Sequence, residues 1–239
     1  MSKRPNILWV SFEDCYPHFG SYGDEVARTP HLDRLAAEGG LWTRAFSTAP
    51  VCGPARSGVI TGMYPVSIGT HHHRTGSGAH YDSLAYSYEA VIPHYVKCFS
   101  EYLRAAGYYC TNNAKTDYQF TAPITSWDEC NSSAHWRNRP DAEDPFFAVF
   151  NLTQTHESNM WEYKDGEPIW PDPGFDLDAI VVPPYFPDTE KVRASIARNY
   201  ANIEYNDRRL GALLRELEDD GLGENTVVFV WTDHGPMPR

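Results

Sequence analysis

Apolar runs of strand length alternate with helical patterns along this chain, and no other feature of the sequence limits its fold more. The run Asn6–Phe12, "NILWVSF", ends abruptly in charged residues, and "PFFAVFNLTQTH" and "NTVVFVWTDHG" are similar runs that end in polar residues. Short, nearly continuous apolar runs are typical of strands buried on both faces of a parallel sheet. A further strand is expected at about Tyr108–Thr111.

Helical spacing fills the segments between these runs. Thr29 and Pro30 suit the start of a short helix and Gly39 its exit, and a second helix runs through Phe99 and Leu103. The longest pattern has three- and four-residue spacing and ends at a glycine: Val192, Ile196, Tyr200, Ile203, Leu210, Leu213, Leu214, Leu217 and Gly221. This order predicts an α/β fold with a mostly parallel central sheet and helices on both faces.

Composition narrows the possible functions. The 239 residues are 41% hydrophobic, enough for one sizeable core or for a large domain that lacks a partner. The formal net charge of -12 argues against a nucleic-acid ligand, because phosphate binding needs clustered Lys and Arg. We find neither a membrane-spanning apolar run nor a signal peptide. An odd count of five cysteines favours a reducing compartment, so we expect the cytoplasm.

Ionisable residues follow three of the expected strands. Glu13 and Asp14 follow the first, His156 follows "FFAVFNLTQT", and Asp233 and His234 follow the last. Because parallel strands end at one edge of a sheet, these groups are expected to converge where ligands bind. A cation would keep the gathered carboxylates ionised, and oxygen ligands suit calcium or magnesium better than zinc. The alternative is that these residues only begin solvated loops.

Cys52 and Arg56 lie in the segment "TAPVCGPARSGVITGMYP". The residues after Cys52 are expected to form a short helix that ends at Gly62, with Pro54 in its first turn. The thiol would then lie at the positive end of the helix dipole, and Arg56 would offer a planar cation to an oxyanion. The pattern indicates an anion-transfer site. A buried cysteine that serves only as a small hydrophobic residue is the alternative.

The segment "CGPARSGVITG" resembles the signature of the sulfatase family, Cys-x-Pro-x-Arg followed by Thr-Gly. "RPNILWVSFED" and "TDHG" resemble the family's metal-binding strands, and "ARTPHLDRLAAEG", "TGMYP" and "THES" extend the resemblance over nearly the whole chain. "STAPVC" and "IGTHHHR" are similar to the branch related to heparan N-sulfatase. The resemblance implies an alkaline phosphatase-like fold in which residues 1–239 are the N-terminal catalytic domain.

The resemblance implies a role for position 52. A formylglycine-generating maturation enzyme would oxidise Cys52 to an aldehyde, whose hydrate attacks sulfur and later eliminates sulfate. It also implies that Glu13, Asp14, Asp233 and His234 bind calcium, or magnesium, although the family usually has Asp at position 13. Arg56 would steady the diol and the sulfated intermediate.

Further residues carry over from the same resemblance. His156 matches a histidine that contacts sulfate and protonates the leaving group, and Lys115 matches the lysine of a Lys-x-His element. Asp117 stands where that element has histidine, so we expect it to orient Lys115 or to recognise a cationic or hydroxyl-bearing substrate. In "THHHRTG" we expect no zinc site; His72 and Arg74 are expected to contact the substrate.

Sulfatases normally continue past the Asp-His pair, so we expect the C-terminal subdomain to be absent from this chain. A complementing C-terminal segment or a homo-oligomer would then complete the fold. The function expected is hydrolysis of a sulfuric ester or sulfamate of a small sugar. Two alternatives stay open: an impaired relative that binds anions or carbohydrate, and a phosphonate or phosphate ester hydrolase of the same superfamily.

Overall fold

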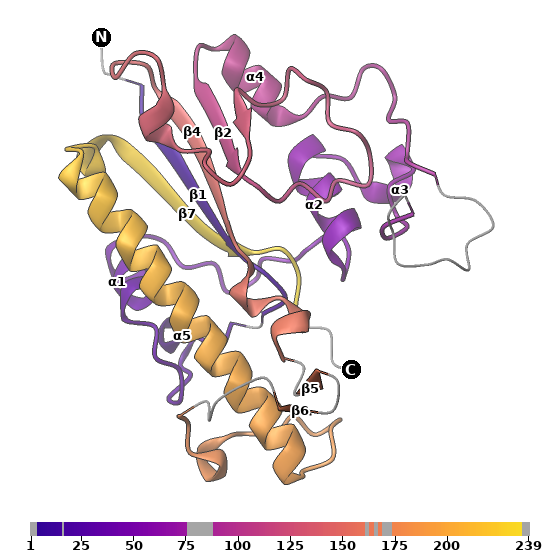
Figure 1. Cartoon of the computed structure of the whole chain (residues 1–239), viewed down its shortest axis with the longest axis vertical. Helices are drawn as coiled ribbons and strands as arrows, with labels where there is room; N and C mark the ends of the chain where they lie inside the picture. The colour runs from indigo at the N-terminus through magenta and orange to yellow at the C-terminus, as the bar shows by residue number, and fades with distance from the viewer. Residues whose placement is uncertain are drawn as a thin grey trace. The chain divides into compact units, whose positions relative to one another are not determined.

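The computed structural model describes most of the chain (Figure 1). The chain divides into two compact units. The described residues are 4–15, 17–75, 88–160, 163–164, 167–168 and 174–235. The first unit contains the chain up to Ser11, Phe46–Asn151 and Leu222–Gly235, and the second contains Phe12–Ala45 and Leu152–Gly221. Three separate stretches of sequence therefore build the first unit.

A five-stranded parallel sheet with the order β3-β2-β4-β1-β7 forms the centre of the first unit. Its strands are β1 (Asn6–Phe12), β2 (Tyr109–Asn113), β3 (Glu129–Cys130), β4 (Phe146–Leu152) and β7 (Thr226–Thr232). In β1 and β4 apolar side chains occupy both faces, and Leu8, Val10 and Ala148 are fully buried. The predicted α/β fold with a parallel sheet is confirmed.

Helices and aromatic side chains complete the core of this unit. The helices are α2 (Cys52–Thr61), α3 (Pro65–Ile68) and α4 (Phe99–Ala105), with short 3-10 turns η2 (Trp136–Asn138) and η6 (Gly223–Asn225). Helix α4 packs on β2, and α2 contacts both α3 and α4. The ring of Trp9 lies 5.2 to 5.6 Å from the rings of Phe99, Phe147 and Trp231. This core supports the strand ends that carry polar residues.

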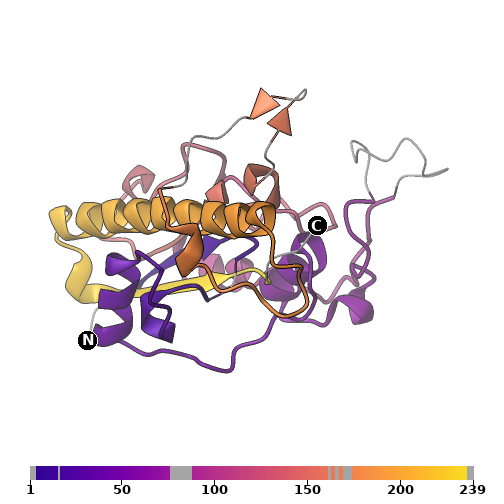
Figure 2. The same cartoon turned by 90° about the horizontal axis from the view of Figure 1, so that it is seen from below.

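The second unit is built around one long helix, α5 (Glu190–Asp219). Its buried residues recur at three- and four-residue spacing, and Figure 2 shows α1 (Pro30–Glu38) beside it. The remaining elements are short: η1 (Gly20–Tyr22), η3 (Thr153–Thr155), η4 (Glu157–Met160), η5 (Leu177–Ala179), β5 (Tyr163–Lys164) and β6 (Glu167–Pro168). The strands β5 and β6 pair antiparallel. None of the helices in the described ranges combines the length and apolarity needed to cross a membrane.

Most expected elements are present, with some differences in their ends. The strand expected at Tyr108–Thr111 is β2, which runs two residues further because Asn112 and Asn113 still pair with β4. Gly221 follows α5 with a φ of 69°, as its predicted role requires. Thr29 and Pro30 stand at the start of α1, as predicted. Thr29 stands before α1, but its hydroxyl accepts from Gly20 N–H instead of capping the helix.

Candidate active site

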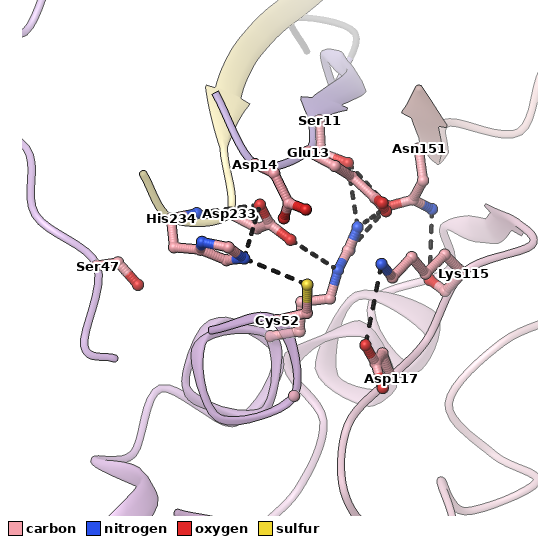
Figure 3. Close-up of polar contacts among 12 residues, drawn as sticks. Ser11, Glu13, Asp14, Ser47, Cys52, Lys115, Asp117, Asn151, Asp233 and His234 are labelled. Atoms are coloured by element: carbon pink, nitrogen blue, oxygen red, sulfur yellow. Dashed lines mark hydrogen bonds and ion pairs between the residues drawn. The ribbon is translucent and has the colours of Figure 1, made fainter. Parts of the chain in front are cut away.

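Cys52 is the first residue of α2 and is only 2% exposed. The chain enters α2 from an extended Val51, Pro54 lies in the first turn, and Gly62 ends the helix with a φ of 67°. The Cys52 Sγ lies 3.2 Å from Nε2 of His234, the second residue after β7 (Figure 3). A helix start and a strand end that are far apart in sequence thus meet at this thiol.

The tautomer of His234 follows from its other contact. Its Nδ1 lies 2.6 Å from the carbonyl oxygen of Gly235, and because a carbonyl only accepts, Nδ1 carries the proton. The lone pair of a neutral His234 is therefore on Nε2, which lies 3.7 Å from Oδ1 of Asp233. Ligand atoms of Cys52, Asp233 and His234 all lie within 4.8 Å of one another. This donor set fits a metal ion.

Arg56 lies one turn along α2 and is 3% exposed. Its Nη1 and Nη2 each donate to Oδ1 of Asn151 at 2.9 Å, and Nη2 lies 3.4 Å from the Ser11 hydroxyl. Its Nε lies 3.4 Å from Oδ2 of Asp233. The guanidinium is thus held between β1, β4 and the end of β7, beside the thiol-imidazole pair.

Lys115 and Asp117 lie on the loop after β2. The Nζ of Lys115 is 3.9 Å from Asp117 Oδ2, whereas Arg74 donates to both Asp117 oxygens at 3.3 and 2.9 Å. Burial raises the pKa of Asp117, but the hydrogen bonds and charge of Arg74 and the charge of Lys115 outweigh it, so this pKa lies below its ordinary value. Asp117 is ionised at neutral pH. Its main partner is Arg74.

The loops that carry these residues adopt backbone conformations that are unusual for side chains other than glycine. Positive φ values occur at Arg74 (48°), Ala114 (76°), Asp117 (52°) and Gln119 (62°). The side chain of Gln119 holds two of these segments together, because its Oε1 accepts from Arg74 N–H at 2.5 Å and its Nε2 donates to Thr75. Such conformations persist where surrounding contacts fix them.

His73, which the sequence did not single out, contacts the first turn of α2. Gly53 N–H donates to Nδ1 of His73 at 3.3 Å, so a neutral His73 carries its proton on Nε2. Burial and the charge of Arg74 lower the pKa of His73 and favour this neutral form. His72 is exposed, and its Nδ1 contacts the hydroxyl of Tyr88.

A small cavity lies in the first unit. Its polar lining is made by Arg56, Asn112, Lys115 and Asn151. Its other walls are mostly apolar and include six aromatic residues: Trp9, Phe99, Tyr118, Trp127, Phe147 and Trp231. Arg56 and Lys115 therefore border the same space, although they come from a helix and from a strand end. Two cations that border one cavity attract an anion.

The other expected site residues belong to the second unit. Glu13 N–H donates to Oγ1 of Thr155 at 3.0 Å, and Oδ2 of Asp14 accepts from Glu157 N–H at 2.8 Å. Nδ1 of His156 accepts from Ser158 N–H at 3.3 Å, which leaves the proton of a neutral His156 on Nε2. The segment after β1 thus lies against the segment after β4.

Sequence reasoning missed Ser11, His73 and Asn151. Asn151 is the polar residue at position six of the otherwise apolar strand β4, and it is 9% exposed. A polar side chain inside a buried strand needs hydrogen-bond partners, so its position was a signal that could have been used. Nothing in the sequence distinguishes His73 from its two histidine neighbours.

The family model described as Sulfatase matches residues 5–141 and 134–239. A Formosa agariphila protein named ulvan-active sulfatase is 45% identical over 270 residues, which cover 100% of this chain and 45% of that protein. Human N-sulphoglucosamine sulphohydrolase is 24% identical, with coverage of 98% and 52%. The chain spans about half the length of these curated relatives.

Solved structures show the same fold. A Bacteroides thetaiotaomicron protein, described with the metabolism of multiple glycosaminoglycans, superposes with a TM-score of 0.72 at 20% identity. The superposition covers 97% of this chain and 61% of the other. The family match extends over nearly all of the sequence and includes both Cys52 and the strand ends just described. This chain therefore belongs to the sulfatase family.

Proposed function

We propose that this chain hydrolyses a sulfuric ester or sulfamate, and that its substrate is a small sulfated sugar. The observation that carries this proposal is the buried contact of the Cys52 thiol with His234, with Arg56 and Asp233 beside it. A nucleophile precursor, a cation for an oxyanion and metal-ligand atoms are thereby gathered at one helix start. The names of the relatives, ulvan-active and N-sulphoglucosamine-acting, support a sugar substrate.

Asp233 and His234 are proposed to hold a calcium ion, with magnesium as the alternative. The donor set supports this, since a carboxylate and the Nε2 lone pair of His234 lie beside Cys52. Asp14 and Glu13 are proposed to complete the metal ligands. Ser11 contacts Arg56, and Asp14 is only three residues further along the chain, a span of at most about 10 Å. The ion would supply Lewis acidity beside the nucleophile.

Cys52 is proposed to be converted to formylglycine by a maturation enzyme. A formylglycine there would supply a hydrated aldehyde as the nucleophile towards sulfur, in place of the thiol. The residues around position 52 would then act on that side chain. His234 Nε2 already faces it at 3.2 Å, and the N-terminus of α2 favours negative charge on it.

Arg56 and Lys115 are proposed to bind the sulfate oxygens, because these two basic side chains border one cavity. Charge that develops on those oxygens in the transition state would be stabilised by the two cations. His156 is proposed to protonate the leaving oxygen or nitrogen from Nε2, since Ser158 N–H occupies Nδ1. Asp117, Arg74 and His72 are proposed to contact the sugar. The ion pair of Asp117 with Arg74 offers the sugar both a hydrogen-bond acceptor and hydrogen-bond donors.

Mass spectrometry and turnover together test the proposal. Conversion of Cys52 lowers the intact mass by about 18 units relative to the thiol. The full chain, co-expressed with a maturation enzyme and supplied with calcium, should show this loss and should release sulfate from an aryl sulfate faster than phosphate from an aryl phosphate. Cys52→Ala should abolish turnover.

Cys110→Ala is the matched control, because Cys110 is a fully buried thiol of the same unit whose pKa burial raises to about 12. This variant should retain sulfate release. An unmodified Cys52 without turnover would instead favour a protein that binds anions or carbohydrate. A strong preference for the aryl phosphate would remove the sulfate assignment.

A further inference from the structure

Asn151 makes hydrogen bonds through both ends of its amide. Its Oδ1 accepts from Nη1 and Nη2 of Arg56 and from the Ser11 hydroxyl, each at 2.9 Å. Its Nδ2 donates to Asn112 Oδ1 at 3.0 Å, to the Asn113 carbonyl at 3.1 Å and to the Lys115 carbonyl at 3.4 Å. Figure 3 shows Asn151 between Ser11 and Lys115.

These partners fix the orientation of the amide. The guanidinium of Arg56 only donates, so the oxygen of Asn151 has to face it, and the carbonyls of Asn113 and Lys115 only accept, so the nitrogen has to face them. A carboxylate at this position could replace the first set of contacts but would repel the carbonyl oxygens. An apolar side chain of similar size would lose both sets.

The contacts of Asn151 connect two cations that come from different elements. Arg56 lies on α2, whereas Lys115 lies on the loop after β2. The side chain of Asn112 also holds the backbone of this loop, because it donates to the Lys115 carbonyl at 3.1 Å. Asn151 lies on β4 between these elements, and the same cavity is bordered by all four side chains. Among these contacts, Asn151 is the residue that hydrogen-bonds both to the Arg56 guanidinium and to the Lys115 backbone.

We propose that Asn151 is a positioning residue, which sets Arg56 and Lys115 at the separation needed to bind one sulfate group. This inference rests on the proposed function, since it concerns the same anion. Asn151 itself would act through the two cations. Misplacement of such groups by about 1 Å lowers rates by about 100-fold.

Asn151→Leu tests the proposal, with Asn6→Leu as its matched control. Asn6 is also a buried amide of the first unit, with 5% exposure, and it likewise joins strands, since its Oδ1 accepts from Phe146 N–H and its Nδ2 donates to Thr226. It lies at the start of β1, far along the strand from Ser11. Loss of either amide should lower the thermal midpoint.

Kinetics and sulfate binding distinguish positioning from a structural role. In the full chain after maturation, Asn151→Leu should lower kcat/KM for an aryl sulfate by about 100-fold and raise KM. The inhibition constant for inorganic sulfate should rise by about tenfold. Asn6→Leu should change both constants by less than about twofold, because lost stability only reduces the folded fraction.

Asn151→Asp covers the case in which Asn151→Leu does not fold. Aspartate has the same shape and keeps acceptors for Arg56, but it has no N–H group for the carbonyls of Asn113 and Lys115. KM and the sulfate inhibition constant should therefore rise in this variant as well. Wild-type values of both constants in the folded variants would overturn the positioning role alone. A wild-type chain that neither hydrolyses aryl sulfate nor binds sulfate would overturn the proposed function, and the positioning role with it.

Discussion

Asp233 in the first unit and Asp207 in the second are each 1% exposed, but their carboxylates have different kinds of partner. Asp233 lies 3.4 Å from Nε of Arg56 and 3.7 Å from Nε2 of His234. Asp207 lies within α5 and accepts from the backbone N–H groups of His31 and Leu32 at 3.2 and 2.9 Å. One carboxylate faces ionisable side chains, whereas the other completes the N-terminus of α1.

The difference shows that burial of a charged group does not by itself mark a functional site. The first turn of α1 leaves N–H groups without partners inside the helix, and Asp207 supplies these partners from a distant helix. The burial of Asp207 is therefore explained by its structural role as an acceptor for these N–H groups. Asp233 lies among a thiol, an imidazole and a guanidinium, which is a combination that carries chemistry.

The largest effect is expected from Asp233→Asn. The variant keeps the shape of the side chain but removes the negative charge proposed to bind the metal ion, so kcat/KM for an aryl sulfate should fall by about 1,000-fold or more. Turnover at several calcium concentrations measures this. Asp207→Asn is the control and should retain turnover within about threefold, because its role is structural. Equal losses in the two variants would erase the contrast between the units.

Asp207→Ala should have the larger effect on stability. It leaves the buried N–H groups of His31 and Leu32 without their acceptor, which should lower the free energy of unfolding by about 2 kcal/mol. Urea denaturation measures this change. Asp207→Asn retains one acceptor oxygen and should lose less. If Asp207→Ala unfolds at the wild-type urea concentration, its contacts with α1 do not stabilise the unit.

The pH dependence of stability should have opposite signs at Asp207 and Asp117. Burial raises the pKa of Asp207 despite its backbone hydrogen bonds, whereas the contacts with Arg74 hold the pKa of Asp117 below its ordinary value. Relative to Asp207→Asn, wild type should therefore lose stability as the pH rises from 3.8 to the folded pKa of Asp207. Relative to Asp117→Asn, it should lose stability as the pH falls below 3.8.

Unfolding free energies of the three proteins between acid and neutral pH test both signs. Each slope should be at most about 1.4 kcal/mol per pH unit, the limit for one proton. Both differences should be flat at pH values well above the folded pKa values of the two groups. Slopes of the same sign would mean that the two carboxylates do not differ in environment as described.

The smallest expected effect concerns which cysteine thiols react with a labelling reagent. Cys52 in the first unit and Cys15 in the second are buried, whereas Cys130 is exposed. In native protein made without the maturation enzyme, iodoacetamide should therefore modify Cys130 and leave the two buried thiols intact. Peptide mass spectrometry identifies the labelled site, and Cys130→Ser should remain unlabelled. Early labelling of Cys15 or Cys52 would show that its unit opens more readily than the other.

Much of the fold could be predicted, because it depends on spacing within single elements. The apolar run that forms β1 and the spacing that forms α5 each lie in one continuous stretch of sequence. The short elements α3, β3 and β5 carry no such pattern and were not predicted. The two-residue strand β3 exists only because Thr111 and Asn112 pair with Glu129 and Cys130.

The sequence by itself determined that Cys52 begins a helix which carries Arg56 one turn later, and that Asp233 and His234 follow a strand. Each of these relations is fixed by the distance between the residues along one short stretch of chain. Only the tertiary structure decided that Asn151 meets Arg56, that Asp117 pairs with Arg74, and that His73 faces α2. Those contacts join residues 20 to 95 positions apart. Such pairs depend on how separate strands, helices and loops pack against one another, and local propensity does not specify that packing.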